Sequence, residues 1–371
     1  MSKIYKNTNV LEAAQKRIAF IFDEFKDIVV SISGGKDSTV LAHLMLVEAH
    51  KRNRKIRLFF LDEEAVYDST VEQIRYLMNL HPENTIPMWY QIEFVLTNAN
   101  SADGYRFMCW ESEKEWMRAK EPNSIKRITW NTKNQRKSSK YGAGGLGFYT
   151  VLRNIQNQYE NACFCVGIRG SESLDRYRAV TTHAGYKSLT WFTKGNQKSY
   201  TAYPLYDWEA SDVWKYLHEN NIKYSPIYDY MYKKGLPMNE LRVSSLIHEK
   251  SFKALVELPE FEPNTYNRLL KRAEGIRNAN LYGKEKKLMQ VRKLPNNFTS
   301  WRQYRDFLLE TAPNEEQKEV FTKRFATHLE NEFVARQQCR QLILNDIGND
   351  LPINNKPNPR KETIKKWSSI L

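Results

Sequence analysis

The chain has 371 residues, of which 41% are hydrophobic, and a formal net charge of +14 at pH 7. This length allows one large domain or two smaller ones, and the charge favours anionic partners without identifying one. Its apolar runs stay far below the roughly 20 residues that cross a membrane. Residues 1–10 lack the apolar stretch of a signal peptide, and four scattered cysteines form no disulfide framework. These features predict a cytoplasmic protein with no membrane partner.

The N-terminal part of the chain alternates amphipathic helices with short apolar strands. The patterns predict helices at 10–25, 39–52 and 68–80, and strands at 27–31, 56–61 and 89–96. Short buried strands separated by helices are typical of a parallel sheet covered by helices on both faces. We therefore predict an α/β fold with a doubly wound parallel sheet, in which ligands bind beyond the carboxyl ends of the strands.

A glycine-rich turn follows the first expected strand. It reads Ser31-Ile32-Ser33-Gly34-Gly35-Lys36-Asp37-Ser38 and opens a helix. Backbone N–H groups at two glycines and a helix N-terminus attract phosphate, and Lys36 adds a full positive charge. Ser33 and Ser38 supply hydroxyl donors, and Asp37 is a carboxylate suited to holding Mg²⁺ against phosphates. The spacing is not that of a Walker A loop. The alternative is a plain strand–helix turn, but the full run favours a nucleotide phosphate site.

Three acidic residues follow the next strand, at the same edge of the predicted sheet. Asp62, Glu63 and Glu64 lie where a carboxylate binds metal or contacts a nucleotide. The alternative is an acidic helix N-terminus that complements the helix dipole. We expect a site role for at least one of the three, with Asp62 as a Mg²⁺ ligand.

Residues 97–147 interrupt this alternation. They are polar, rich in glycine near their end, and include a basic stretch, 126–140, with six Lys or Arg residues and no acid. We expect an insertion over the site, in the manner of a mobile lid. A buried strand at 163–168 then resumes the sheet, and its Cys163 and Cys165 are expected to be core residues.

A second polar run follows that strand and opens a helix. It reads Gly167-Ile168-Arg169-Gly170-Ser171-Glu172-Ser173-Leu174-Asp175-Arg176. Arg169 and Arg176 are suited to a planar, bidentate clamp on an anion, and Glu172 to orienting an arginine. The alternative is a surface helix of alternating charge. The place of the run at the carboxyl end of a strand favours a binding role.

A third run extends from Tyr203 to Leu217 and leads into a helix expected at 209–219. Asp207 is predicted to be the N-cap of this helix, and Trp208 and Trp214 are predicted to pack in the core. Asp207 is a weaker candidate for the site.

The chain becomes helical and strongly charged after residue 245. Residues 266–293 hold nine basic and two acidic residues, and further helices are expected at 301–309 and within 313–343. Such basic segments bind nucleic acid or an acidic partner, or they form a solvated helix face, and both interpretations stay open. The expected domains are 1–244 and 245–371.

The glycine-rich turn resembles the pyrophosphate loop, SxGGxDS, of the N-type ATP pyrophosphatases (the PP-loop superfamily). The runs from Gly167 and from Tyr203 are similar to signatures of their sulfonucleotide reductase and sulfurylase branch. The resemblance implies a Rossmann-like fold of the adenine nucleotide alpha hydrolase type that binds ATP and Mg²⁺. The implied nucleotide-binding residues are Ser31, Ser33, Gly34, Gly35, Lys36, Asp37, Ser38, Asp62, Gly167, Arg169, Glu172 and Ser173. The implied catalytic residues are Lys36, Asp37, Arg169 and Arg176, with Asp37 and Asp62 on Mg²⁺.

A likeness over nearly the whole chain is to the phosphoadenosine phosphosulfate (PAPS) reductase-like proteins typified by a co-activator of prophage immunoglobulin-binding gene expression. The residues that carry it are Cys109-Trp110-Glu111, Trp116, Gly275-Ile276, Tyr282-Gly283, Trp301 and Tyr304. Such proteins are commonly paired with a ParB-like nuclease-fold protein, which implies a partner of that kind. The reductases use a C-terminal cysteine that the tail of this sequence does not have, and the four cysteines support no iron–sulfur cluster. A homo-oligomer is also compatible with the sequence.

Together these inferences predict an enzyme that cleaves ATP between the α- and β-phosphates and adenylylates an acceptor, in a sulfur- or nucleic-acid-related pathway. One alternative is a sulfonucleotide transferase or reductase that uses an external thiol. The other is a non-catalytic nucleotide sensor associated with DNA. The sequence names no acceptor.

Overall fold

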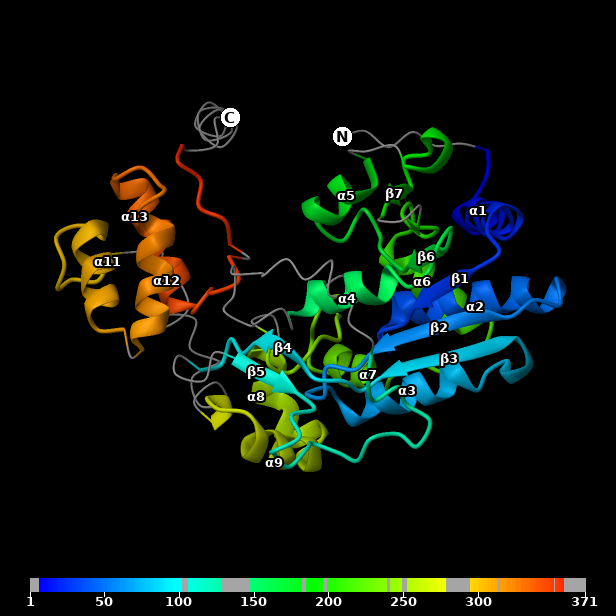
Figure 1. Ribbon diagram of the computed structural model, residues 1–371, viewed down its shortest axis with the longest axis horizontal. Helices are drawn as coiled ribbons and strands as arrows, with labels where there is room; N and C mark the ends of the chain where they lie inside the picture. The colour runs from blue at the N-terminus through cyan, green and yellow to red at the C-terminus, as the bar shows by residue number, and fades with distance from the viewer. Residues whose placement is uncertain are drawn as a thin grey trace. The chain divides into compact units, whose positions relative to one another are not determined.

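The computed structural model describes residues 7–101, 106–128, 147–181, 185–195, 199–238, 241–248, 252–277, 294–312, 314–349 and 351–356. The chain divides into two compact units (Figure 1). The first comprises residues 1–94, 109–139 and 143–245, and the second comprises residues 95–108, 140–142 and 246–371. None of the helices in the described part of the chain has the length and hydropathy of a membrane span.

A six-stranded sheet forms the centre of the first unit, with the strand order β3-β2-β1-β6-β8-β7. The strands are β1 (Ile28–Ser31), β2 (Ile56–Leu61), β3 (Thr85–Tyr90), β6 (Cys163–Val166), β7 (Phe192–Lys194) and β8 (Tyr200–Ala202). All neighbouring strands pair in parallel except β7, which runs antiparallel to β8. Figure 1 shows β1, β2 and β3 side by side with their arrowheads at one edge. The predicted α/β fold with a mostly parallel sheet is confirmed.

The sheet forms because its central strands are buried on both faces. In β1, Val30 lies opposite Leu58 of β2 on one side and Cys165 of β6 on the other, and all three are fully buried. Such continuous apolar strands are stable only when helices cover both faces. Cys163 and Cys165 are buried with their sulfur atoms 3.8 Å apart, as expected of core residues.

Helices of the first unit supply the rest of this core. They are α1 (Val10–Glu24), α2 (Lys36–Lys51), α3 (Asp68–Met78), α4 (Phe148–Gln156), α5 (Leu174–Thr181), α6 (Ala210–Glu219) and α7 (Ile227–Lys233). Helix α2 packs against α1, α3 and α6, so it is the central helix of this layer. The cap of α6 is Glu209, which forms a capping box with Asp212. The prediction of Asp207 as the N-cap was therefore wrong, because Asp207 instead pairs with Arg17 through both carboxylate oxygens.

One expected strand, 89–96, was also wrong. The structure has two strands there, β3 and β4 (Phe94–Thr97), which belong to different sheets. Pro87 is tolerated inside β3 because β3 is the edge strand of the sheet. The break between them holds Gln91, whose buried side chain donates to Asp62 and accepts from the backbone of Glu121. Strand β3 therefore ends before Gln91, whose hydrogen bonds are made with residues far away in the sequence, although the neighbouring residues are apolar.

The second unit contains most of a two-stranded sheet and a set of helices. The elements are β4, β5 (Arg106–Cys109), α8 (Phe252–Phe261), α9 (Pro263–Arg272), α11 (Trp301–Glu310), α12 (Glu315–Phe325) and α13 (Glu332–Ile343). Helices α11 and α13 pack together, and Phe321, Phe325 and Ile347 form a small apolar core. The helical character predicted after residue 245 is confirmed for the described residues.

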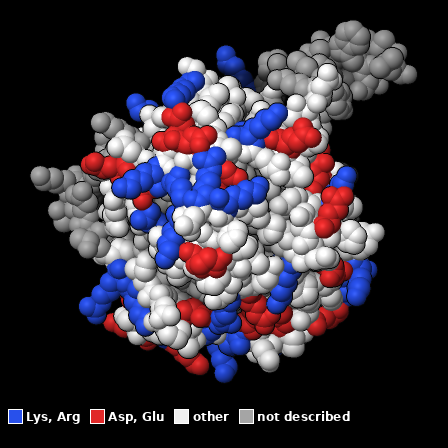
Figure 2. Space-filling view, turned by 90° about the vertical axis from the view of Figure 1, so that its right-hand side faces the viewer, with Lys and Arg blue, Asp and Glu red and all other residues white. Residues whose placement is uncertain are grey.

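Much of the basic sequence lies outside the described residues. Residues 129–146 of the expected lid and residues 278–293 of the basic C-terminal segment belong to that part. The face of the molecule in Figure 2 shows Lys and Arg interspersed with Asp and Glu. This pattern is typical of a solvated surface.

Candidate functional site

The strand order places a ligand site beside β1. From β1 the chain passes through α2 to β2 and then through α3 to β3, whereas β6 pairs with the other side of β1. The direction of winding therefore reverses between β1 and β6. In open α/β sheets, ligands bind outside the carboxyl ends of the strands at such a reversal. The two runs predicted from the sequence, 31–38 and 167–176, follow these two strands.

The glycine-rich turn holds its shape through its own hydrogen bonds. Gly34 has a φ of +70°, and a Cβ atom there would lie 2.8 Å from Cγ2 of Thr70. The Ser38 hydroxyl accepts from the Ser33 N–H at 3.1 Å and donates to the Gly35 carbonyl at 3.0 Å. Gly35 is the N-cap residue of α2 and has no side chain to satisfy the helix N–H groups. A helix start without a capping side chain is the kind of site that can bind an external anion.

Lys36 is almost completely buried beside the turn, with 3% of its surface exposed. Its ammonium donates to the carbonyl of Leu241 at 2.8 Å and lies 3.2 Å from the Asp37 carboxylate. Its backbone N–H donates to the Tyr228 hydroxyl at 3.0 Å. Burial lowers the pKa of Lys36, and the nearby Asp37 opposes this shift. Charge interactions at this desolvated position are stronger than they are in water.

The loop after β6 meets the start of α2. Arg169 is buried and donates from Nε to the carboxylate of Asp37, with which it forms an ion pair. Its Nη1 donates to the Ser171 hydroxyl at 3.3 Å. A Cβ atom at Gly167 would lie 3.0 Å from the backbone oxygen of Asp37, so glycine permits this close approach. Asp37, Gly167 and Arg169 were predicted as site residues, and the structure brings them together.

Arg176 lies in a different ion pair from Arg169. Its Nη1 donates to Glu172, and its side chain is 41% exposed. Glu172 also faces Arg242, whose Nε lies 3.6 Å from the carboxylate and whose Nη2 donates to the Glu172 backbone oxygen. Sequence reasoning missed Arg242 because it joins the cluster only through the tertiary fold. The predicted two-arginine clamp is thus divided, and Arg176 is paired with Arg242 around one carboxylate.

Asp62 does not lie free at the strand end. It is fully buried, and its carboxylate accepts from Trp89, Gln91 and Arg118 side chains and from the Glu64 N–H. A carboxylate with four donors has no room for a hydrated metal ion. The environment argues for a structural role in place of the Mg²⁺ role expected from its position.

Glu63, the residue after Asp62, has a raised pKa. Burial raises its pKa to about 7, against a hydrogen bond from Ser245. The Ser245 hydroxyl oxygen also lies 3.3 Å from the backbone oxygen of Ala65. Residues 241–245, which we call the strap, therefore contact the loops after β1, β2 and β6 through Leu241, Ser245 and Arg242 respectively.

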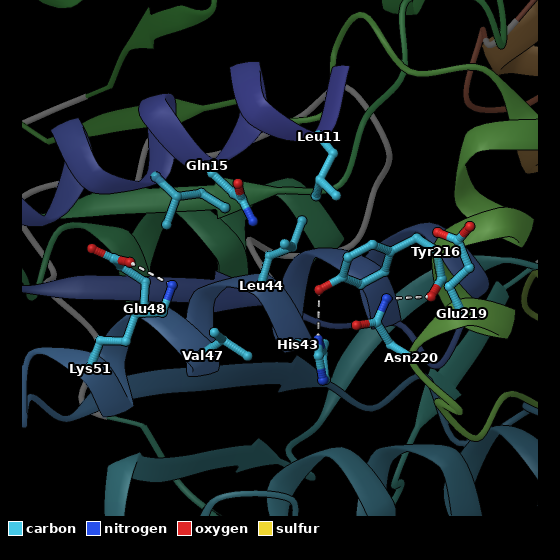
Figure 3. Close-up of a pocket in the computed structure, with 11 residues that line it drawn as sticks. Leu11, Gln15, His43, Leu44, Val47, Glu48, Lys51, Tyr216, Glu219 and Asn220 are labelled. Atoms are coloured by element: carbon cyan, nitrogen blue, oxygen red, sulfur yellow. Dashed lines mark hydrogen bonds and ion pairs between the residues drawn. The ribbon is translucent and has the colours of Figure 1, made fainter. Parts of the chain in front are cut away.

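A cavity of about 320 Å³ lies elsewhere, between α1, α2 and α6 (Figure 3). Its lining includes Leu11, Leu44 and Tyr216, and the Tyr216 hydroxyl is 2.8 Å from Nδ1 of His43. None of the predicted site residues lines it. Its position over the helix layer, away from the strand ends, separates it from the glycine-rich loop at residues 31–38.

The four cysteines are all buried and free of disulfides. Burial raises the pKa of Cys163 and raises the pKa of Cys339 to about 12. Nucleophilic cysteines are thiolates with lowered pKa values in partly exposed positions. No cysteine in this chain is in such a position.

Comparisons with known proteins identify relatives of this chain. Residues 27–234 match the model of the phosphoadenosine phosphosulfate reductase domain, and residues 235–338 match a domain of unknown function (DUF3440). An uncharacterized protein of Escherichia coli K12, YbdN, is 28% identical over 339 residues, which cover 88% of this chain and 81% of YbdN.

Two solved structures are similar to this chain at lower sequence identity. The PAPS reductase of Candida auris in a phosphate complex is 13% identical, with a TM-score of 0.35, over 62% of this chain and 94% of that chain. The FMN adenylyltransferase of Candida glabrata in complex with ATP is 14% identical, with a TM-score of 0.34, over 62% of each chain. The domain match spans more than half of the sequence and includes both loops of the candidate site. The chain therefore belongs to the phosphoadenosine phosphosulfate reductase domain family.

Proposed function

We propose that this protein binds ATP at residues 31–38 and cleaves it between the α- and β-phosphates, giving pyrophosphate and an adenylylated acceptor. The observation that supports this most strongly is the loop itself. A helix N-terminus whose N-cap is a glycine, a buried lysine and two hydroxyls gather at the point where the sheet reverses its winding. Such a site favours a polyphosphate.

The loop residues and Arg169 have different roles in neutralising the charge of the substrate. The N–H groups of Gly34 and Gly35 and the ammonium of Lys36 neutralise the negative charge on the leaving pyrophosphate. Arg169 holds the α-phosphate or an anionic acceptor from the β6 side. Catalysis of this kind is mostly positioning and charge neutralisation, because phosphoryl-type transfers need little covalent help from protein.

A Mg²⁺ ion fits the residues at the loop but not those at Asp62. The Asp37 carboxylate is an oxygen group of the kind that Mg²⁺ prefers, and its side chain retains 16% exposure. When bound, the ion supplies further neutralisation of the phosphate charge.

The strap competes with the phosphates for Lys36. The ammonium of Lys36 donates to the Leu241 carbonyl, and binding of a phosphate replaces that neutral acceptor with a charged one. We propose that the strap shifts when the nucleotide binds and that Lys36 then turns to the phosphate.

A second candidate is a sulfonucleotide transferase that uses an external thiol. The three arginines Arg169, Arg176 and Arg242 around Asp37 and Glu172 favour a doubly anionic substrate. The buried cysteines require that any thiol come from another molecule. A PAPS-like substrate would occupy the same loops.

Product analysis separates these candidates. The protein is incubated with ATP and Mg²⁺ in a cell extract freed of other nucleotides, and pyrophosphate, ADP and phosphate are measured. Pyrophosphate is expected from ATP and not from an analogue with a methylene bridge between the α- and β-phosphates. Release of ADP and phosphate contradicts the proposal. Sulfite release from PAPS with added thiol supports the second candidate, and ATP binding without any product supports the nucleotide sensor.

A further inference from the structure

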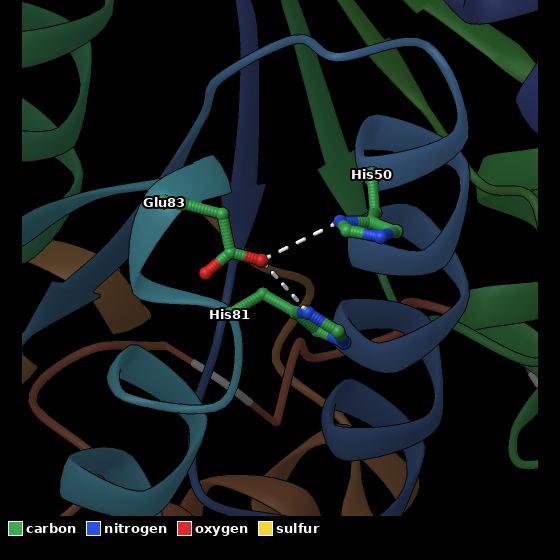
Figure 4. Close-up of side chains that lie close together, drawn as sticks. All are labelled: His50, His81 and Glu83. Atoms are coloured by element: carbon green, nitrogen blue, oxygen red, sulfur yellow. Dashed lines mark hydrogen bonds and ion pairs between the residues drawn. The ribbon is translucent and has the colours of Figure 1, made fainter.

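Two histidines and a glutamate meet at the opposite edge of the sheet from the nucleotide loop (Figure 4). His50 lies in the last turn of α2, and His81 and Glu83 lie at a short turn of 3-10 helix (Pro82–Asn84) that leads directly into β3. This edge holds the amino ends of the parallel strands. Figure 4 shows the three side chains pointing toward one another.

The two distances from Glu83 to the histidines suit a tetrahedral metal ion. One carboxylate oxygen of Glu83 lies 3.4 Å from Nδ1 of His50 and 3.3 Å from Nδ1 of His81. Three ligand atoms, one from each residue, lie within 4.8 Å of one another. Bonds of about 2.0–2.1 Å in a tetrahedral zinc site place neighbouring ligand atoms about 3.3–3.4 Å apart. We infer that His50, His81 and Glu83 bind a divalent transition-metal ion, with Zn²⁺ as the best fit.

The two imidazole nitrogens and one carboxylate oxygen also indicate the class of metal. Imidazole nitrogen suits Zn²⁺, Ni²⁺ and Cu²⁺, whereas Mg²⁺ and Ca²⁺ take oxygen ligands. Three protein ligands leave a fourth position for water or an outside ligand. This ion is therefore distinct from the Mg²⁺ proposed at Asp37, in both chemistry and place.

The backbone that carries the ligands is held before any metal arrives. The Asn84 N–H and the Thr85 hydroxyl both donate to the His81 carbonyl, at 3.0 and 2.8 Å. Asn84 is buried, and its amide donates to the Arg54 carbonyl at 2.9 Å while its Oδ1 lies 3.1 Å from Nδ1 of His50. Nδ1 of His50 thus faces both Asn84 and Glu83, and a metal ion on Nδ1 replaces its proton and its hydrogen bond to Asn84.

Hydrogen bonding explains the 3.1 Å contact between His50 and Asn84, but it is a weaker explanation of the two contacts with Glu83. The contacts of 3.3 and 3.4 Å exceed the 2.7–3.2 Å typical of a good N–H···O bond. An exposed ion pair contributes about 0–1 kcal/mol. The side chains of His50 and Glu83 are 63% and 54% exposed, so an ion reaches them without opening the fold. Bound metal would join the end of α2 to the entry of β3 and stabilise the folded state by mass action.

The test uses Zn²⁺ and Co²⁺ alone as probes, with the full chain purified without a histidine tag and treated with a chelator. Wild-type protein is expected to bind one Co²⁺ with the visible absorption of a four-coordinate nitrogen and oxygen site, and Zn²⁺ is expected to displace it. His50→Ala, His81→Ala and the isosteric Glu83→Gln should each weaken binding at least about tenfold. His218→Ala, which removes an exposed histidine of α6, serves as the matched control and should bind like wild type.

A second readout is the melting temperature. Zn²⁺ should raise it in wild type and in His218→Ala and leave it unchanged in His50→Ala and His81→Ala. Absence of Co²⁺ binding to wild type, or wild-type affinity in both histidine variants, overturns the inference. The ATP proposal is tested independently, because variants of Lys36 should still bind the metal.

Discussion

Gly34 is the residue that the backbone of the loop needs most. Its φ of +70° is in the left-handed region, and the side chain of Thr70 occupies the space that a Cβ atom would need. In the proposed site Lys36 has a different role, because its ammonium would supply the positive charge, and Asp37 opposes the lowering of its pKa by burial. One residue shapes the phosphate site and the other charges it.

The Gly34→Ala variant should lower the free energy of unfolding by about 2 kcal/mol, since a non-glycine residue in this conformation costs about 1–2 kcal/mol and the contact with Thr70 adds to it. Gly235→Ala is the matched control. Gly235 also has a positive φ, +82°, but nothing lies within 4 Å of its added Cβ. Urea unfolding should show the larger loss for Gly34→Ala, and equal losses would mean that the close approach to Thr70 has no energetic weight.

Glu63 should make the stability depend on pH. Its pKa rises from 4.5 to about 7 in the folded state. A carboxyl with a raised pKa favours folding while it is protonated, so its contribution is complete below about pH 4.5 and is lost as the pH rises through about 7. Glu63→Gln should therefore gain about 1–2 kcal/mol over wild type at pH 8 and little at pH 4.5.

Urea unfolding of wild type and Glu63→Gln at both pH values checks this difference. Glu113→Gln, at an exposed position, controls for the loss of one negative charge. A gain that is the same at both pH values, or one that Glu113→Gln reproduces, would show that the raised pKa of Glu63 does not control stability.

Among the helices, strands and loops, the sequence predicted the features that a short run of neighbouring residues determines. The loops after β1 and β6 were found because each combines an apolar strand, small or polar turn residues and a helix start in one short run. The burial of Asp62, the place of Arg242 and the start of β3 at Thr85 were not found. Each depends on partners far away in the chain, such as Arg118 for Asp62 and Glu172 for Arg242. Periodicity and propensity contain no information about those contacts.

Burial of the cysteines in β6 and α13 gives a prediction about reactivity. Cys163 and Cys165 lie inside the sheet and Cys339 inside a helix, with raised pKa values for Cys163 and Cys339. The native protein should react slowly with a disulfide thiol reagent and quickly after unfolding in urea. Protein treated with the reagent under native conditions should keep the proposed ATP-dependent release of pyrophosphate. Rapid native reaction coupled to loss of activity would revive a cysteine-based reductase mechanism.

At the scale of the whole molecule, the net charge of +14 concentrates in segments outside the nucleotide loop. Within residues 266–277, Lys271 is exposed, whereas Arg272 donates to the Met108 carbonyl and covers the Phe107 ring. Reversing Arg272 would therefore disturb the fold as well as the charge. Lys271 and, in the same basic segment, Lys286 are the better positions for a test of nucleic-acid binding.

Duplex DNA affinity should fall with salt if this segment contacts phosphates, with a slope in log affinity against log salt of roughly −0.9 per contact. The Lys271→Glu and Lys286→Glu reversals should reduce that slope, and Lys323→Glu on the exposed part of α12 should not. Filter binding or fluorescence anisotropy from low to physiological salt measures it. Two results would mean that the basic segment serves solubility alone. One is that DNA does not bind at low salt, and the other is that the three reversals have the same salt slope as one another.

Binding of ATP should depend on the loop after β1. Isothermal titration calorimetry with ATP and Mg²⁺ should give at least about tenfold weaker binding for the double variant Lys36→Ala with Asp37→Ala, which is about 1.4 kcal/mol. The control is Lys215→Ala with Glu219→Ala, which removes an exposed lysine–carboxylate pair of α6 whose atoms lie 3.7 Å apart. The control variant should bind ATP with wild-type affinity, and the loop variant should show the loss. Unchanged affinity in the folded loop variant would contradict it.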